Sequence, residues 1–256
     1  MSDEAHRRLI VDEFTRQAVP FAQMRDPSPE LILAASGVGP AHVVLDVACG
    51  PGLVACAFAQ VARHVTGIDL TPAMIEQARA RQQAQGLANL TWQVGEVLPL
   101  PYPGASFSLV FTRYSFHHFL DPKAVLAEMV RVCVPGGKVM VVDVFTVSPE
   151  QADAYNRMEK LRDPSHVRAL HLSELEDLFR EAGLGNVTTG FYKHAFELEQ
   201  VLAGSFPRPG DADLIHRIFR DDLGVNRLGL DTCEREGAIH FAYPIVILLG
   251  QLKSLA

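Results

Sequence analysis

The sequence predicts an α/β fold in which helices cover both faces of a doubly wound, mostly parallel sheet, and three observations support this prediction. Short apolar runs of strand length alternate with stretches of helix length through residues 31–194. Short turns rich in glycine and proline join these runs, as they do in strand–helix–strand units. Acidic residues, Asp46 and Asp69, stand at the ends of the first two runs, where open parallel sheets bind ligands. We therefore expect a binding site beyond the carboxyl ends of the strands.

The chain opens with a stretch that predicts an amphipathic helix. Apolar Leu9, Phe14 and Phe21 recur at helical spacing within residues 4–24, before a break at residues 26–29. On spacing alone this helix caps the sheet. We treat residues 1–30 as an N-terminal helical segment, and residues 31–36 form a short helix that leads into the first strand.

The central part of the chain predicts five parallel strands that alternate with helices. We expect the strands at residues 43–46, 65–68, 90–94, 106–111 and 138–144. We expect the helices between them at residues 53–60, 72–85 and 122–132. Pro135, Gly136 and Gly137 form the turn before the fifth strand. Trp92 alternates with apolar neighbours, and we interpret it as a core residue.

The last third of the chain predicts further helices and two strands. We expect helices at residues 150–161, 173–182, 196–203 and 211–223, and strands at residues 186–193 and 239–249. Ser173 and Glu176 form a capping-box pattern at the start of the second of these helices. The predicted organisation is a core at residues 31–194, a helical insert at residues 195–238 and a closing strand within residues 239–256.

The composition excludes several classes of protein. A net charge of −7 in 256 residues, with no run of lysine or arginine, argues against a general nucleic-acid-binding protein. The four cysteines show no ligand-like spacing, and we interpret them as reduced thiols of a cytoplasmic protein. No apolar run is long enough to span a bilayer, so we expect no integral membrane association. The oligomeric state stays open, a homodimer included.

The turn after the first strand has the properties of a ligand cradle. Gly50 and Gly52 lack a Cβ, so the backbone can adopt positive φ and a ligand can lie on the peptide plane. Asp69 ends the second strand, where a carboxylate can accept hydrogen bonds from both hydroxyls of a ribose. This pattern allows NAD and other adenosine cofactors, although Ala55 stands where the dinucleotide fingerprint has its third glycine.

Five sequence motifs follow one another between about residues 40 and 145. They are LDVACGPG, GIDLTPAMIEQA, GEVLPLP with Glu96, YSFHHFLDP and VPGGKV. In this order they resemble the motifs of the class I S-adenosylmethionine-dependent methyltransferases, in particular the branch of ubiquinone and menaquinone biosynthesis. Ala48 replaces the first glycine of the first motif, and GEVLPLP aligns without a gap to the third. The match is close over about residues 40–145.

The resemblance implies a Rossmann-like fold, a seven-stranded sheet with an antiparallel final strand, S-adenosylmethionine as cofactor and no metal. S-adenosylhomocysteine would be the product. Asp69 would hold the ribose, Met74 would pack on the adenine and Glu96 would accept from its amino group. The implied cofactor contacts are Asp46, Ala48, Gly50, Gly52, Asp69, Leu70, Met74, Gly95, Glu96, Val97 and Arg113. The resemblance also implies that the N-terminal helix is a lid over cofactor and substrate, and that the insert covers the acceptor.

Methyl transfer from a sulfonium needs an aligned acceptor, and it needs a base only when the acceptor must first lose a proton. Histidines are the candidate bases because their ordinary pKa lies near neutral pH. We expect one of His117 and His118 to face the site while the other packs or meets solvent, and loss of His118 to lower turnover. A structural role for either is equally open. Asp143 can orient a histidine or cap the turn after the fifth strand.

The resemblance places a further loop near the acceptor, and His166 is also a candidate catalytic residue. The candidate acceptor contacts are Phe21, Tyr114, His166 and Arg168. A polar loop with an Arg–Asp pair is the structural alternative for residues 163–168. We interpret His171 and His194 as surface or packing residues. Metal binding by His166 and His171 is disfavoured because no acidic or thiol partner stands at a ligand-like interval.

Three functions remain open on the sequence. The first is methyl transfer to a carbon or oxygen of a small aromatic, quinol-like or natural-product acceptor. The second is an NAD-dependent oxidoreductase, which the absence of a separate Tyr-x-x-x-Lys motif disfavours. The third is a protein that keeps the cofactor site without transferring methyl groups, either as a binding module or as an enzyme recruited to another reaction.

Overall fold

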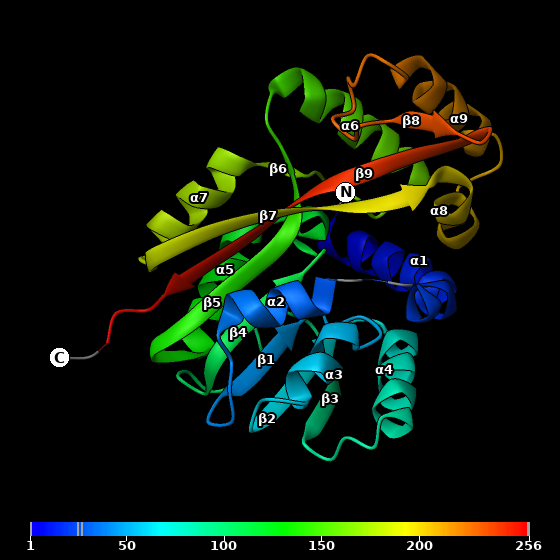
Figure 1. Ribbon diagram of the computed structural model, residues 1–256. Coiled ribbons are helices and arrows are strands. Elements are labelled where there is room, and N and C mark those ends of the chain that lie inside the picture. The colour runs from blue at the N-terminus through cyan, green and yellow to red at the C-terminus, as the bar shows by residue number, and fades with distance from the viewer. Residues whose placement is uncertain (1, 25, 27, 255–256) are drawn as a thin grey trace.

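The computed structural model describes residues 2–24, 26 and 28–254, and it shows one central sheet with helices on both faces (Figure 1). The strands are β1 (Val43–Val47), β2 (His64–Asp69), β3 (Leu90–Val94), β4 (Phe107–Arg113), β5 (Cys133–Thr146), β6 (Leu170–His171), β7 (Gly185–Glu197), β8 (Cys233–Arg235) and β9 (Ala238–Gln251). The helices are α1 (Asp3–Gln23), α2 (Ser28–Ser36), α3 (Leu53–Ala59), α4 (Pro72–Ala84), the 3₁₀ turn η1 (Phe116–His118), α5 (Pro122–Val132), α6 (Pro149–Arg162), α7 (Leu172–Glu181), α8 (Leu198–Ser205) and α9 (Asp211–Asp222). None of the helices in the described part of the chain is both long and apolar enough to cross a membrane.

The strand order confirms the predicted Rossmann-like sheet. Seven strands lie in the order β3-β2-β1-β4-β5-β9-β7, and β6 and β8 are short additions that pair with β5 and β9. The strands from β1 to β5 are parallel, whereas β9 runs antiparallel to both of its neighbours. The chain changes direction between β1 and β4, and such switch points are where open α/β sheets bind ligands. The carboxyl ends of β1, β2 and β4 therefore frame the expected site.

The fifth strand begins earlier than expected. Pro135, Gly136 and Gly137 were predicted as a turn before the strand, but they lie within β5, which starts at Cys133. The register between β4 and β5 shifts between Phe107 and Leu109, and Gly136 has a φ of 78°. The extra residues thus form an irregularity inside the strand pair, which glycine accommodates without steric cost.

The predicted ends of two helices also need correction. Phe196, expected in a helix, belongs to β7, because the pairing with β9 continues to Glu197 opposite His240. Helix α7 begins one residue before the predicted cap, and the carboxylate of Glu174 accepts a hydrogen bond from the backbone N–H of His171 at 2.9 Å. The pair Ser173 and Glu176 is therefore not the cap of this helix.

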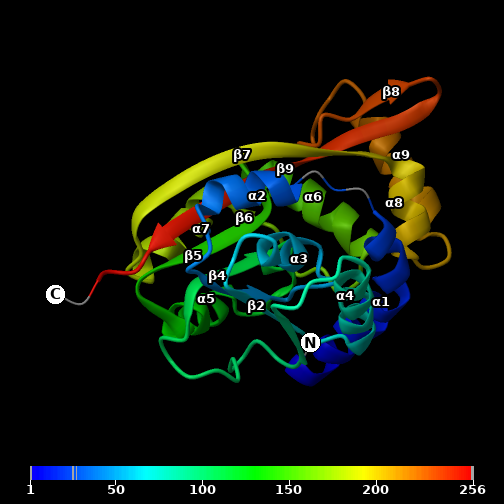
Figure 2. The same cartoon turned by 60° about the horizontal axis from the view of Figure 1, so that its bottom comes forward.

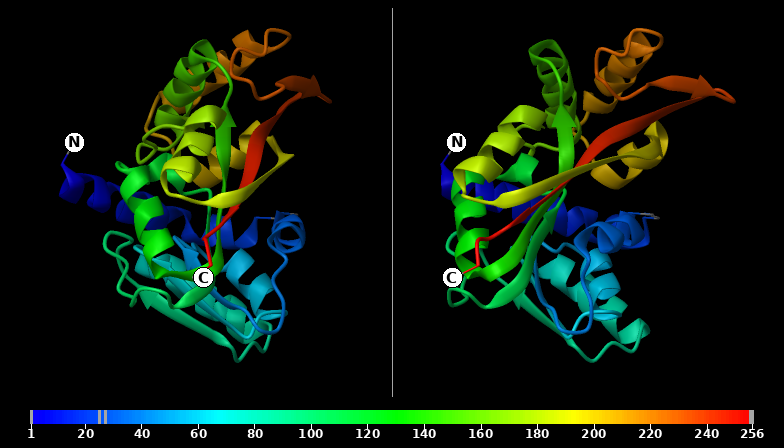
Figure 3. Two further views of the ribbon diagram at one scale, coloured as in Figure 1. Left: turned by 90° about the vertical axis from the view of Figure 1, so that its left-hand side faces the viewer. Right: turned by 60° about the vertical axis from the view of Figure 1, so that its left-hand side comes forward.

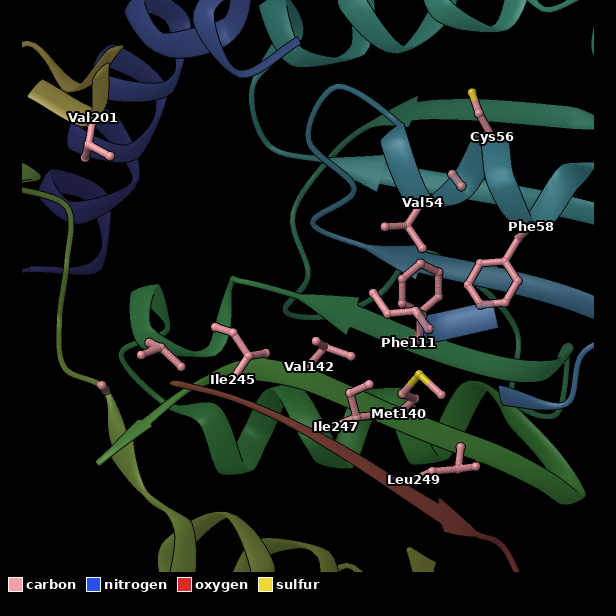
Figure 4. Packing of buried hydrophobic residues seen from close by; sticks show 14 of the residues in the cluster. Val54, Cys56, Phe58, Phe111, Met140, Val142, Val201, Ile245, Ile247 and Leu249 are labelled. Carbon is pink, nitrogen blue, oxygen red and sulfur yellow. The ribbon is translucent and has the colours of Figure 1, made fainter. Parts of the chain in front are cut away.

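The central strands are buried on both faces, so the hydrophobic core has two layers. Phe111 of β4 faces α3, where its ring lies 4.8 Å from that of Phe58 (Figure 4). The neighbouring Val110 belongs to the opposite layer and packs with Leu126 and Met129 of α5. This alternation is typical of a parallel strand with helices on both sides. Packing on both faces holds the central strands in place, so the strand ends that carry the site have a rigid support.

Two parts outside the sheet close over its carboxyl edge. Helix α1 crosses that edge beside α4 and α8 (Figure 2). Its position is tied by Arg81, whose Nη2 donates to the carbonyl of Ala22 at 2.7 Å. The segment between β7 and β9 carries α8, α9 and β8, and α9 packs against α6 at the same end of the sheet (Figure 3).

We predict that Gly67→Ala destabilises the fold by about 1–3 kcal/mol, because overpacking a tight core strains it. A Cβ at Gly67 would lie 2.5 Å from Trp92 Cζ3 and 2.9 Å from Cys49 Sγ. Gly39→Ala is the matched control, since its Cβ would meet nothing within 4 Å. Urea unfolding measures both, and Trp92→Leu should recover part of the loss in the Gly67→Ala background. Equal costs for the two glycine variants would contradict the packing argument.

Candidate active site

A cavity of about 760 Å³ opens at the carboxyl ends of the parallel strands. The loops after β1, β2, β3 and β4 form its floor, and α1, α6 and α8 form its walls. Helix α1 contributes the apolar side chains Ile10, Phe14 and Phe21. The cavity lies at the edge that the sequence predicts. We call the part formed by the loops after β1, β2 and β3 the glycine-loop side, and the part formed by η1 and α6 the histidine side.

On the glycine-loop side, the loop between β1 and α3 follows the path that the sequence predicts. Ala48, Gly50 and Gly52 have positive φ angles of 56°, 52° and 72°. The backbone N–H of Gly50 donates to Asp69 Oδ2 at 2.8 Å, and the N–H of Thr71 donates to Asp69 Oδ1 at 2.8 Å. Burial raises the pKa of Asp69 although these bonds oppose the shift. Asp69 therefore fixes the loop and still lines the cavity with unused acceptor positions.

Beyond the loop, the cavity continues over the ends of β2 and β3. Leu70, Met74 and Val97 provide an apolar lining there, and the side chain of Met74 is buried. Glu96 also lines the cavity, and its carboxylate accepts from Arg7 Nη1 of α1 at 2.7 Å. Both partners are about half exposed, so this ion pair contributes little to stability.

Most of the residues predicted to bind a cofactor meet at this cavity. Asp46, Ala48, Gly50, Asp69, Leu70, Met74, Glu96, Val97 and Arg113 line it. Gly52 and Gly95 do not, because both face the core: a Cβ at Gly52 would lie 2.7 Å from Trp92, and one at Gly95 would lie 3.2 Å from Ile68. The lack of a side chain at Gly52 and Gly95 therefore allows close packing beneath the loop.

Arg113 lies at the end of β4, beside the glycine loop. Its Nη1 donates to the carboxylate of Asp26 and to Ser28 Oγ, the latter at 2.6 Å. The guanidinium carbon lies 4.3 Å from the centre of the Tyr114 ring, within the range of a cation–π contact. Asp26, which the sequence did not single out, lines the same cavity.

The histidine side contains a hydrogen-bonded pair of His117 and Asp143. His117 Nδ1 donates to Asp143 Oδ1 at 2.5 Å. The other carboxylate oxygen accepts from the backbone N–H groups of Ser115 at 3.1 Å and Phe116 at 2.6 Å. Burial opposes protonation of His117, but the charge and hydrogen bond of Asp143, together with the charges of Glu159 and Asp163, outweigh it, and the pKa of His117 is raised. Because Nδ1 carries the proton, Nε2 is the basic nitrogen of the neutral ring.

His118 also lines the cavity, so the expectation that only one of the two histidines faces the site is wrong. Its Nδ1 donates to the carbonyl of Ser165 at 3.1 Å, and its Nε2 lies 3.9 Å from Asp163 Oδ2. Burial, together with the neighbouring His117, lowers the pKa of His118 to about 4. The ring packs against Phe14 of α1 at 5.1 Å. His118 is therefore neutral near pH 7 and forms part of the cavity wall. His117, whose Nδ1 is bonded to Asp143, has the geometry expected of a general base.

The remaining sequence candidates lie in different places. Phe21 and Tyr114 line the cavity. His166 is buried behind His117, with ring centres 5.4 Å apart, and its Nε2 donates to Asn156 Oδ1 at 2.8 Å. Arg168 is half exposed and pairs with Glu174 rather than with an aspartate. Neither His166 nor Arg168 is among the residues that line the cavity.

Several residues that line the histidine side were not predicted from the sequence. Tyr155, Glu159 and Arg162 line the cavity from one face of α6. Glu159 accepts from Arg162 Nη2 at 2.6 Å and from the hydroxyl of Tyr243 at 2.8 Å. Burial raises the pKa of Tyr155 and of Tyr243. The spacing of Tyr155, Glu159 and Arg162 is the helical signal that a search for one polar face would have found.

His194 also lines the cavity, although it was interpreted only as a surface or packing residue. It is buried, its Nδ1 lies 3.2 Å from the hydroxyl of Tyr114, and its ring lies 4.2 Å from that of Phe196. It therefore packs, as expected, but within the site.

The thiols and imidazoles of the described residues form no group of three or more that could hold a metal ion. The four cysteines are free. Burial raises the pKa of Cys56 to about 11 and that of Cys133 to about 12, so both stay protonated near neutral pH.

Comparison with known proteins identifies the type of domain. Residues 45–141 match the family described as a methyltransferase domain. The chain is 37% identical over 139 residues to the uncharacterised methyltransferase YcgJ of Bacillus subtilis. The aligned segment covers 54% of this chain and 55% of that protein. It is 39% identical over 102 residues to a demethylmenaquinone methyltransferase of Deinococcus radiodurans, covering 39% of this chain and 42% of that enzyme. The chain thus spans about half the length of these relatives.

Solved structures agree over a greater length. The crystal structure of YcgJ superposes with a TM-score of 0.81 at 25% identity and covers 89% of this chain and 99% of that one. A structure from Bacillus halodurans, assigned as a methyltransferase, superposes with a TM-score of 0.79 at 25% identity and covers 90% of this chain and all of that one. Residues 45–141 therefore match a methyltransferase domain, and the described chain has the Rossmann-like fold of these structures.

Proposed function

We propose that this protein transfers a methyl group from S-adenosylmethionine to a carbon or oxygen of a small aromatic or quinol-like acceptor. The observation that carries the proposal is the position of the His117–Asp143 pair, which shares one cavity with the loop braced by Asp69. One side of this cavity has the features of a nucleoside site. The other side has a base for an acceptor that must lose a proton.

The glycine-loop side suits an adenosine cofactor. A Cβ at Gly50 would meet no heavy atom within 4 Å, so the space beside this peptide is open to a ligand. Asp69 has acceptor positions for ribose hydroxyls, while Leu70 and Met74 suit the faces of an adenine. Glu96 can accept from the adenine amino group, in exchange for its exposed contact with Arg7. S-adenosylmethionine, when bound, supplies a methyl group on a positively charged sulfur.

His117 has the role of general base in this proposal. Its neutral Nε2 accepts the proton of a phenol or carbon acid, and the carboxylate of Asp143 stabilises the imidazolium that results. Asp143 in turn is held by two backbone N–H groups of η1, so the orientation of the imidazole is fixed. The apolar side chains of α1 line this cavity, and an apolar lining disfavours water beside the reacting groups.

The lining of the histidine side supports an aromatic acceptor. The rings of Tyr155 and Tyr243 meet edge to face at 6.3 Å, and Phe196 packs against Tyr243 at 5.6 Å. Aromatic walls of this kind bind planar ligands. The similarity to a demethylmenaquinone methyltransferase, described above, supports a quinol-like compound. Cofactor binding without methyl transfer is the alternative that the following experiments distinguish.

We predict that isothermal titration detects binding of S-adenosylhomocysteine but not of NAD. Asp69→Asn should weaken S-adenosylhomocysteine by about tenfold or more, because a charge-assisted hydrogen bond contributes about 1.5–3 kcal/mol. Asp231→Asn, which changes an exposed carboxylate remote from the cavity, is the control. Binding of NAD in preference to S-adenosylhomocysteine would point to an oxidoreductase instead.

We predict that His117→Ala lowers kcat by about 10²–10⁴-fold with phenolic acceptors, as expected for loss of a general base. The assay is methyl transfer to a panel of catechols and quinols. A nitrocatechol that is already ionised at neutral pH should be methylated by His117→Ala at nearly the wild-type rate. His118→Ala is the neighbouring comparison and should affect both acceptor types alike. Equal losses with both acceptors in His117→Ala would refute the role of base, and no transfer to any acceptor would favour a binding protein.

We predict a shifted pH dependence in Asp143→Asn. The reaction requires neutral His117, so kcat/KM falls as the pH drops below the pKa of His117. That pKa is raised by Asp143, and removal of the charge should move the acid limb to lower pH while the plateau falls. An acid limb that stays in place in Asp143→Asn would show that another group is responsible.

A further inference from the structure

We propose that the hydroxyl of Tyr155 selects acceptors that carry a second oxygen, to which it donates a hydrogen bond while His117 faces the group that loses its proton. The inference rests on the function proposed above and narrows its substrate class. The acceptor is then a phenol with a further ether, carbonyl or hydroxyl oxygen. In the proposed function Tyr155 is only part of an aromatic wall, and its hydroxyl has no role.

Tyr155 has a buried hydroxyl without a partner. Its side chain is only 3% exposed, and it lines the cavity. The hydroxyl makes no hydrogen bond to any residue that the structure describes. The hydroxyl of Tyr102 is also unpartnered, but it is shut off from solvent and Tyr102 does not line the cavity, whereas the hydroxyl of Tyr155 remains accessible. Because a buried hydroxyl without a partner is destabilising, phenylalanine would serve packing better at this position.

The polar groups beside Tyr155 on α6 are already bonded to one another. Glu159 Oε1 accepts from the hydroxyl of Tyr243 at 2.8 Å. Glu159 Oε2 accepts from Arg162 Nε at 2.9 Å and from Arg162 Nη2 at 2.6 Å. The charge of Arg162 also compensates that of Glu159, so this pair does not attract a charged ligand. The hydroxyl of Tyr155 is therefore the donor that this face of α6 offers to a neutral oxygen.

The hydroxyl of Tyr155 is fixed both in its protonation and in its direction. Burial and the charge of Glu159 raise the pKa of Tyr155 well above its ordinary value, so the group keeps its proton near neutral pH. The ring is held edge to face by Tyr243 at 6.3 Å and by His166 at 6.0 Å. Little side-chain ordering is then needed when a ligand oxygen binds, which favours affinity.

Tyr155 and His117 lie close enough to contact one ligand. The ring of His166 packs against both, with its centre 6.0 Å from that of Tyr155 and 5.4 Å from that of His117. The charge of Asp143, the partner of His117, also acts on the hydroxyl of Tyr155. In the cavity, neutral His117 offers an acceptor at Nε2 and Tyr155 offers a donor. A phenol with a second oxygen is complementary to both, because it brings one O–H group and one further acceptor.

The absence of the second oxygen should be costly. A phenol without it would cover the hydroxyl of Tyr155 and leave this donor unpaired. Sites built to hydrogen-bond a substrate atom discriminate against analogues that lack the atom for this reason.

The test compares methoxyphenols with ethylphenols as methyl acceptors, at the ortho, meta and para positions. The two substituents have nearly the same size, and the ether oxygen accepts a hydrogen bond without donating one. For the wild-type protein we expect kcat/KM to be about 5- to 10-fold higher for at least one methoxyphenol than for the ethylphenol of the same pattern, as one net hydrogen bond provides. In Tyr155→Phe this ratio should fall to about 1, with the ethylphenol rate kept within about twofold. Tyr102→Phe, which removes the unpartnered hydroxyl outside the cavity, is the matched control and should keep the wild-type ratio.

Titration of the same phenols in the presence of S-adenosylhomocysteine measures the preference without turnover, and it should disappear in Tyr155→Phe there too. Thermal unfolding should show Tyr155→Phe to be at least as stable as the wild-type protein, because the lost hydroxyl has no protein partner. A wild-type protein that methylates both series alike, or a Tyr155→Phe variant that loses both series equally, would overturn the inference and leave the proposed function intact. Absence of transfer to every phenol would instead overturn the proposed function, and this inference with it.

Discussion

The hydrogen bond from the N–H of Gly50 to the carboxylate of Asp69 is the contact on which the site depends. It joins the loop after β1 to the end of β2, and the same carboxylate holds the start of α4 through the N–H of Thr71. The loop must have positive φ at both Ala48 and Gly50, a backbone state that local preferences alone do not select for alanine. Without Asp69 the cradle would lose the group that defines its shape.

The same arrangement recurs on the other side of the switch point. Asp143, near the end of β5, accepts from the N–H groups of Ser115 and Phe116 in the loop after β4. In both cases a carboxylate at one strand end fixes the loop that follows the neighbouring strand. One of these loops forms the glycine-loop side of the cavity and the other carries the histidines. A parallel sheet makes this possible because the ends of its strands meet at one edge.

Much of the sheet could be predicted from the sequence because its signals are local. Strand β3 has the expected bounds, and α5 begins at Pro122 after the cap Asp121, whose carboxylate accepts from the N–H of Ala124. The irregular start of β5 could not be predicted in this way, since Pro135 and Gly136 give the same local signal in a turn and in a bulge. The end of β7 at Glu197 depends on its pairing with a strand some forty residues later, which no local pattern contains.

The residues of the candidate site also differ in whether a local pattern or a tertiary contact brings them together. Asp69 and Gly50 belong to a continuous motif, and the structure places them together. The partner of His117 is Asp143 on another strand, and the partner of Arg113 is Asp26 on a segment before the sheet. Such pairs depend on tertiary contacts, so the sequence offered the residues without the pairing. Glu159 and Arg162 share one face of α6, but their contact with Tyr243 joins α6 to β9, and no local pattern contains that pairing.

Helix α1 touches both sides of the cavity, and this has a kinetic consequence. Arg7 contacts Glu96 on the glycine-loop side, while His6 Nε2 donates to the carbonyl of His118 at 2.7 Å on the histidine side. A displacement of this single helix would therefore break a contact on each side of the cavity at once. Under the function proposed above, one opening motion would serve the departure of both products, and its rate would set an upper limit on turnover.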